Sequence, residues 1–161
     1  MKLTLCVVGR MRAKQPETQL VADYLERMQG VGRGLGITQI SIQEVEERRS
    51  LPGDQLKQRE ADLLRAVLPQ GAWLVALDEH GENLSSRAFA ARLGQWRNTG
   101  QENVAFLIGG ADGLSSDLLD ACNAKIAFGT MTWPHRLVRV MLCEQLYRAL
   151  TILANHPYHR D

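Results

Sequence analysis

The sequence predicts an α/β protein with a mainly parallel β-sheet and helices on both faces. Short apolar runs alternate with longer segments whose apolar residues recur at helical spacing, the pattern of repeated β-α units. The runs at residues 3–8 and 104–108 are almost wholly apolar, as expected of strands buried on both faces. With 161 residues, 45% of them hydrophobic, the chain can form one domain with a sizeable core. We therefore expect a single domain over residues 1–161.

The first quarter of the chain opens with a strand at 3–8 that ends at Gly9. A helix is predicted at 17–29, because its apolar residues repeat at helical spacing, and Gly30 is expected to end it. The glycine-rich segment at 30–36 then predicts a flexible connector, since it matches neither common phosphate-binding fingerprint. A second strand is predicted at 37–45.

The middle of the chain continues the alternation. We expect a helix at 54–68, a strand at 73–77 and a turn at 78–81. Ser85 or Ser86 can cap the next helix, because a serine hydroxyl accepts a hydrogen bond from a free amide of the first turn. The buried stripe of that helix is expected to contain Phe89, Leu93 and Trp96.

The last third begins with the strand at 104–108, then a short helix through Cys122, a strand at 125–128 and a long helix at 136–155. The apolar residues of the long helix cover more than the single stripe that a surface helix needs. This surplus predicts a surface for self-association, and complete burial within one core is the alternative.

Charge and cysteine content exclude several classes of protein. Lys and Arg total 19 against 18 Asp and Glu, so a net charge of +1 offers no general attraction to a polyanion. Cys6, Cys122 and Cys143 lie far apart in apolar stretches, which predicts buried thiols rather than a disulfide framework. The opening apolar run is too short for a secretory signal, and charged residues interrupt the long helix. We therefore expect a cytoplasmic protein with no membrane segment.

Three loops should carry the chemistry, because ligands of parallel sheets bind outside the carboxyl ends of the strands. These loops follow Leu77, Ile108 and Phe128, and they are rich in glycine, small polar and apolar residues. Glycine there either lets the backbone approach a ligand or permits a tight turn, and spacing alone does not separate the two. The combined lining suits a nucleoside with a thioether tail. His135 is either a helix-entry residue or a polar group beside this pocket.

No catalytic constellation of a common hydrolase is present, and no metal site is predicted. His156 and His159 have metal-ligand spacing, but the sequence supplies no clear third ligand.

Several sequence blocks resemble one known family. LIGGADGL, MTWPHRLVRVMLCEQLYRA and the terminal NHPYHRD occur in order, and ALDEHGENLSSRAFA precedes them. These blocks are similar to the RlmH family, the SPOUT-class methyltransferases that modify N3 of a pseudouridine in 23S ribosomal RNA. The similarity runs the whole length of the chain and is densest from Leu77 to Arg160.

The resemblance implies a fold, a cofactor and partners. It implies a carboxyl-terminal trefoil knot, with the knotted cofactor-binding part at about residues 73–161. It also implies S-adenosylmethionine as cofactor, a homodimer that pairs through the knotted region, and the assembled ribosome as substrate. Carried onto this sequence, the cofactor site comprises Leu77, Gly109, Gly110, Phe128, Gly129, Thr130, Met131, Thr132 and Trp133.

The resemblance also places the terminal tail beside an active site, either its own or that of the partner subunit. His159 is then a candidate proton acceptor, Tyr158 a candidate for stacking on a base, and Arg160 a candidate for contacting phosphate or a substrate carbonyl. His135 and Arg139 are candidate substrate-binding residues.

Two positions depart from the family pattern. Trp133 stands where a smaller apolar residue is usual, and Arg136 replaces a more common polar residue. Two other functions stay open at this point: a non-catalytic RNA- or nucleotide-binding module of the same fold, and an enzyme acting on a small molecule.

Overall fold

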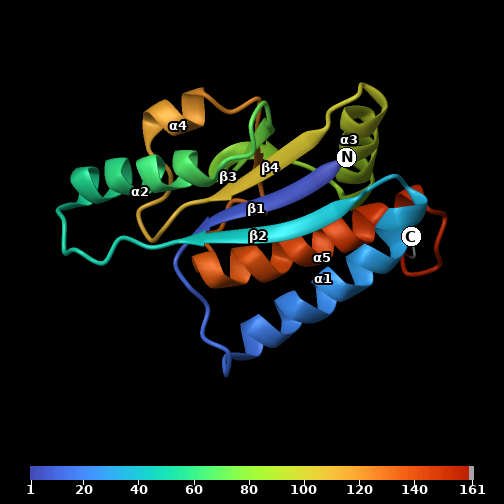
Figure 1. Ribbon diagram of the computed structural model, residues 1–161, viewed down its shortest axis with the longest axis horizontal. Coiled ribbons are helices and arrows are strands. Elements are labelled where there is room, and N and C mark those ends of the chain that lie inside the picture. The colour runs from blue at the N-terminus through green and yellow to red at the C-terminus, as the bar shows by residue number, and fades with distance from the viewer. Residues whose placement is uncertain (160–161) are drawn as a thin grey trace.

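The computed structural model describes residues 1–159 and confirms the α/β fold (Figure 1). Five parallel strands form one sheet in the order β2-β1-β4-β3-β5. The strands are β1 Lys2–Val8, β2 Gln39–Val45, β3 Trp73–Asn83, β4 Asn103–Ile108 and β5 Ala124–Ala127. The helices are α1 Pro16–Gly34, α2 Gly53–Val67, α3 Ser86–Asn98, α4 Ser116–Asp120 and α5 His135–Leu153.

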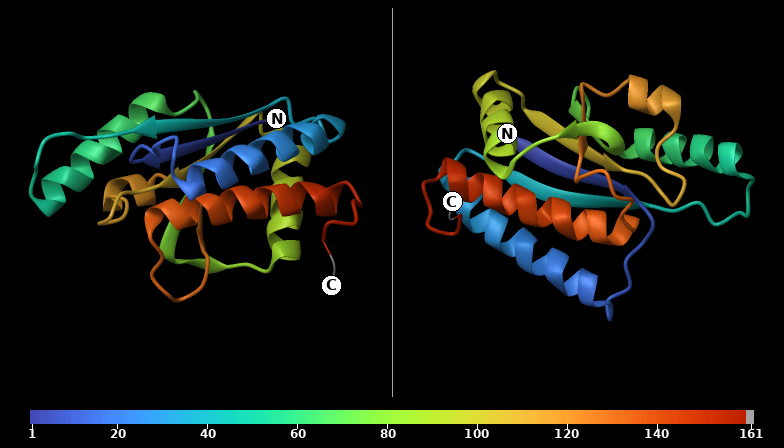
Figure 2. Two further views of the ribbon diagram at one scale, coloured as in Figure 1. Left: turned by 90° about the horizontal axis from the view of Figure 1, so that it is seen from below. Right: turned by 180° about the vertical axis from the view of Figure 1, so that it is seen from behind.

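Helices cover both faces of the sheet, as predicted. Leu3, Leu5 and Val7 of β1 belong to a core shared with α1, α3 and α5. Cys6 and Val8 belong to a second core shared with α2 and α4. The alternation follows from the strand period of two, which sends successive side chains to opposite faces. Figure 2 shows α1 and α5 running side by side along the first face.

The predicted connector at residues 30–36 is wrong, because α1 continues through its glycines to Gly34. Gly32 is buried, and a Cβ at this position would lie 3.1 Å from the Cβ of Ile37. The glycine thus allows the chain to fold closely back toward β2. Glycine usually disfavours a helix interior, but here tertiary packing outweighs that local preference.

The strand β3 is longer than predicted. Leu77 and Glu82 both pair with Ile126 of β5, so residues 78–81 form a bulge within one strand instead of a turn that ends it. Gly81 makes this possible, because a Cβ there would lie only 2.6 Å from the backbone of Ile126.

The remaining elements agree with the predictions to within a few residues. Ser85 caps α3, with its hydroxyl accepting a hydrogen bond from the Ala88 amide at 3.1 Å. Cys6 and Cys143 are buried, as expected, and Cys122 is half-buried. Within residues 1–159, no helix is long and apolar enough to cross a membrane.

Candidate active site

The loops that follow β3, β4 and β5 meet around a cavity of about 720 Å³. This volume lies within the usual range for small-molecule sites, roughly 300–1,000 Å³. Every residue predicted to bind the cofactor lines the cavity except Thr130, which lies between two lining residues of the same loop. The structure therefore brings the predicted site together at the carboxyl edge of the sheet.

The loop after β4 is folded tightly against itself. Gly110 and Gly113 form an isolated bridge, with the Gly113 amide donating to the Gly110 carbonyl at 3.1 Å. A Cβ on Gly109 would lie 2.5 Å from the carbonyl carbon of Gly113, a distance that no side chain can accommodate. Only glycine fits at position 109 in this turn, so close packing of the backbone explains the residue.

The loop after β5 is held by polar contacts from its neighbours. The Gly129 amide donates to Asn83 Oδ1 at 2.9 Å, and Trp133 Nε1 donates to the Phe128 carbonyl at 3.1 Å. Thr132 Oγ1 lies 3.4 Å from Glu79 Oε2 in the bulge of β3. The large indole of Trp133, at the position unusual for the resembled family, therefore closes its own loop and stays 39% exposed at the cavity.

The described residues of the cavity wall carry more negative than positive charge. Asp78, Glu79 and Asp112 supply three carboxylates, against one ammonium group from Lys57. The bulge at 78–81 brings the first two carboxylates to the wall. Such a wall favours a ligand with a positive charge.

Glu60 of α2 supports the loop after β4 from the side. The Gly110 amide donates a hydrogen bond to the Glu60 carboxylate. Burial and the charge of Asp112 raise the pKa of Glu60, and the Gly110 amide opposes that shift. Sequence reasoning missed Glu60, because nothing in the pattern of α2 distinguishes it from a solvent-facing glutamate.

His135 lies at the cavity and also begins α5, so both of its predicted positions hold. Its Nε2 is 3.5 Å from where a Cβ of Gly9 would stand. Burial, followed by the charges of Arg136 and Arg139, lowers the pKa of His135. These effects favour the uncharged form of the imidazole.

Arg139, a predicted substrate-binding residue, is 1% exposed and does not line the cavity. Its guanidinium forms an ion pair with Glu44 of β2. The same group donates a hydrogen bond to the Gly9 carbonyl at 2.8 Å. In this structure the guanidinium of Arg139 therefore binds groups within the protein, and it joins α5 to the loop after β1.

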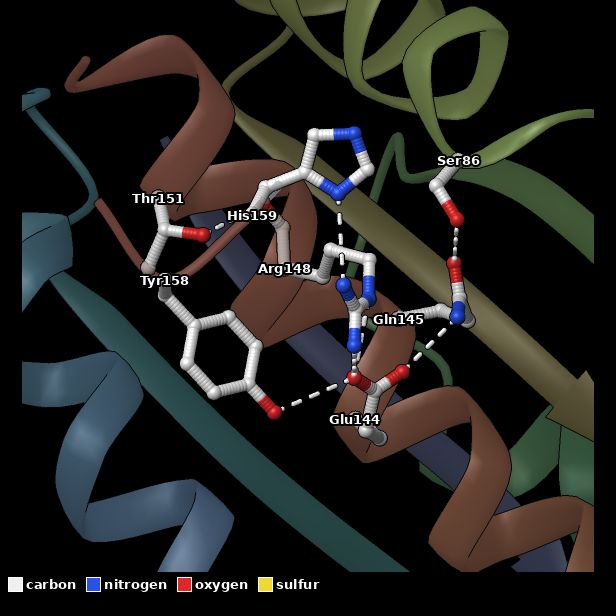
Figure 3. Close-up of polar contacts among 7 residues, drawn as sticks. All are labelled: Ser86, Glu144, Gln145, Arg148, Thr151, Tyr158 and His159. Atoms are coloured by element: carbon white, nitrogen blue, oxygen red, sulfur yellow. Dashed lines mark hydrogen bonds and ion pairs between the residues drawn. The ribbon is translucent and has the colours of Figure 1, made fainter. Parts of the chain in front are cut away.

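The described part of the terminal tail, through His159, lies away from the cavity, against the second half of α5 (Figure 3). Tyr158 donates from its hydroxyl to Glu144 at 3.2 Å and packs edge-on against Tyr147, with ring centroids 4.6 Å apart. His159 Nδ1 lies 3.2 Å from a guanidinium nitrogen of Arg148. Burial is the main cause that raises the pKa of Tyr158 to about 12. Arg160 lies outside the described residues.

Comparison with known proteins identifies the family. The sequence profile of a family described as "Predicted SPOUT methyltransferase" matches residues 1–159. The chain belongs to the SPOUT methyltransferase family. Two relatives named "Ribosomal RNA large subunit methyltransferase H" confirm the resemblance to the RlmH branch. The one from Dinoroseobacter shibae is 55% identical over 160 residues, which cover 99% of both chains. The one from Paracoccus denitrificans is 51% identical over 161 residues, which cover 100% of both chains.

Among solved structures, this SPOUT chain is similar to a probable methylase family protein from Haemophilus influenzae Rd KW20. The TM-score is 0.49 at 9% sequence identity, over 99% of this chain and 70% of the other. Within residues 1–159 of the SPOUT chain, no three His, Cys, Asp or Glu side chains are grouped so that they could hold a metal ion.

Proposed function

We propose that this protein transfers a methyl group from S-adenosylmethionine to N3 of a pseudouridine in 23S ribosomal RNA, acting on the assembled ribosome in the cytoplasm. The observation that carries the proposal is the cavity where the loops after β3, β4 and β5 converge. Relatives whose printed name is a ribosomal RNA large subunit methyltransferase, about half identical over the full chain, support the choice of substrate. A non-catalytic binding module is not favoured by these relatives.

The residues of the cavity fit S-adenosylmethionine. Gly109 and Gly110 line the cavity with backbone groups, and Leu77, Met131 and Trp133 offer apolar contacts for the adenine and thioether parts of the cofactor. The excess of carboxylates in the wall suits a sulfonium ligand, which carries a positive charge. When bound, S-adenosylmethionine supplies an activated methyl group that an uncharged or anionic nitrogen can accept.

The remaining work for the protein is to position the nucleotide and to accept the proton of its imide nitrogen. His159 is the proposed acceptor, but its Nδ1 faces the Arg148 guanidinium in this structure and is 3.2 Å from it. A ring nitrogen that accepts from a guanidinium cannot also accept a substrate proton. His159 must therefore leave Arg148 before it can accept a proton, and Tyr158 and Arg160 are proposed to contact the substrate beside it.

We further propose a homodimer in which the tail of one subunit completes the cavity of the other. A second cavity of about 440 Å³ lies along α5, between α1 and the segment that leads from β3 into α3, and the apolar part of its wall includes Leu20, Val140 and Met141. Phe128 and Gly129 line both cavities, so a second copy seated on the second cavity would lie directly behind the cofactor loop. Most apolar residues of α5 are buried in the core, and the half-buried Val140 and Met141 line this groove. The knot over residues 73–161 and the single domain remain parts of the same proposal.

Transfer of labelled methyl groups tests the reaction. Intact ribosomes and free 23S RNA, both from a strain that lacks this protein, would be incubated with enzyme and labelled S-adenosylmethionine. Label at one pseudouridine, in intact ribosomes only, is the expected result. No label on either substrate, with the cofactor shown to bind, would overturn the proposal and leave a binding module or a small-molecule enzyme.

Mixed dimers test the role of the tail. One subunit would lack residues 158–161, and the other would carry Gly109→Ala in its cofactor loop. If the tail serves the partner subunit, the mixed dimer regains activity that both parent dimers lack. If the tail serves its own cavity, the mixture stays inactive.

A further inference from the structure

Four exposed basic residues lie in the loop after β1 and at the start of α5, next to His135 of the cavity wall. Arg10, Arg12 and Lys14 occupy the loop between β1 and α1, and Arg136 lies in the first turn of α5. Among the residues that the structure describes, none of these four side chains forms an ion pair. Figure 1 shows the loop leaving the tip of β1 beside the start of α5.

The backbone of this loop is firmly held, although its side chains are exposed. The Gly9 amide donates to the Val45 carbonyl at 2.8 Å, and the Gly9 carbonyl accepts from Arg139 at 2.8 Å. The Met11 amide donates to Glu44 at 3.1 Å. The Arg12 amide donates to Gln15 Oε1 at 2.9 Å. A backbone fixed in this way loses little further conformational entropy when the loop binds a partner.

The loop is joined to the cavity through His135. The imidazole of His135 lines the cavity and also packs beside Gly9, the first residue of the loop. The four basic residues therefore lie near one edge of the cavity, and the cavity wall carries an excess of carboxylates. A polyanion would be attracted to the four cations and repelled by the wall.

Resting on the proposed function, we propose that Arg10, Arg12, Lys14 and Arg136 form a phosphate-binding rim. The rim holds the backbone of the RNA strand whose base enters the cavity. Guanidinium and ammonium groups bind phosphate oxygens and fix the position of a strand without reading its sequence. This arrangement gives a protein of net charge +1 a local site for RNA in place of a general attraction.

The test compares two variants that each remove two positive charges. Arg12→Gln/Lys14→Gln removes them from the rim. Lys2→Gln/Arg33→Gln is the matched control, because both residues are exposed and lie at the start of β1 and the end of α1, away from the cavity. Thermal unfolding and titration with S-adenosylmethionine should give wild-type values for both variants.

Steady-state methylation of ribosomes is measured over a series of KCl concentrations. The rim variant should raise the KM for ribosomes about ten-fold, with kcat little changed, and lower the slope of log KM against log salt by about 1.4 to 1.8 for two lost phosphate contacts. The control should match the wild type. A rim variant with the KM and slope of the control would overturn the proposal.

Two further measurements separate failure of the rim from failure of the proposed reaction. Co-sedimentation with ribosomal large subunits reports binding whether or not methyl transfer occurs, and it should fall for the rim variant alone. A photo-crosslinking amino acid in place of Lys14 should label 23S RNA. Equal co-sedimentation of all forms, or a crosslink to a ribosomal protein instead of RNA, would refute the rim even if methylation were demonstrated.

Discussion

Replacing Arg139 by methionine tests whether this residue acts inside the protein or on the substrate. Methionine retains most of the side-chain length and removes the guanidinium. Glu44 would lose its ion-pair partner and the Gly9 carbonyl would lose its charged donor. The loop from residue 9 to residue 15 would then be held less firmly at the start of α5.

The expected cost follows from the burial of the two partners. Removing one partner of a buried ion pair costs about 3–5 kcal/mol. The side chain of Glu44 is 31% exposed, so water can partly solvate the carboxylate that is left, and the cost should be smaller. We expect Arg139→Met to lower the free energy of unfolding by about 2–3 kcal/mol. For a chain of this length, that corresponds to a fall in Tm of about 5–10 °C.

Urea unfolding followed by circular dichroism measures this loss, and Glu44→Gln provides the second arm of a double-mutant cycle. In the Glu44→Gln background, Arg139→Met should cost clearly less, because the ion pair has already been weakened. Unchanged stability of Arg139→Met together with a raised KM for ribosomes would refute the internal role. That result would favour the substrate contact that the family resemblance implies.

Three other predictions concern Gly109, His135 and Cys122. Gly109→Ala should raise the Kd for S-adenosylmethionine at least about ten-fold in isothermal titration, because its Cβ would force the turn to open; an unchanged Kd would contradict this account of the loop. The folded-state pKa of His135 lies below 6.5, so the unfolded state binds more protons and stability falls as pH drops below that value. In His135→Gln, the midpoint of urea unfolding should therefore fall less steeply as the pH is lowered. The same pH dependence as in the wild type would contradict the lowered pKa of His135. Burial raises the pKa of Cys122 to about 11, so iodoacetamide should modify it much more slowly than free cysteine at neutral pH, as mass spectrometry can follow.

The order of strands and helices could be predicted from sequence because each element buries a recognisable apolar pattern. The runs at 3–8 and 104–108 became central strands buried on both faces. The errors arose where tertiary contacts outweighed local preference. Gly32 stays helical because it packs under Ile37, and residues 78–81 bulge because β5 pairs with β3 on both sides of them. Neither contact leaves a trace in the local sequence.

The cavity could be predicted for a similar reason, since parallel topology brings the carboxyl ends of β3, β4 and β5 to one edge. The residues that hold the loops around the cavity could not be predicted. Glu60 reaches the loop after β4 from α2, and Glu44 reaches Arg139 from β2. A buried arginine and an exposed arginine look alike in a sequence, so the internal role of Arg139 became visible only in the structure.

The distribution of charge links these contacts to the choice of partners. Acidic residues of β2 and of the segment after it are paired with arginines: Glu44 with Arg139, and Glu47 with Arg49 and Arg59. Their pairing leaves the cations of the loop after β1 without acidic partners among the described residues, although the whole chain carries a charge of only +1. A protein with a basic edge beside an acidic cavity wall would attract phosphate at that edge and repel it from the wall. On the proposed function, the shape of the ribosome would then select the RNA segment that reaches the cavity.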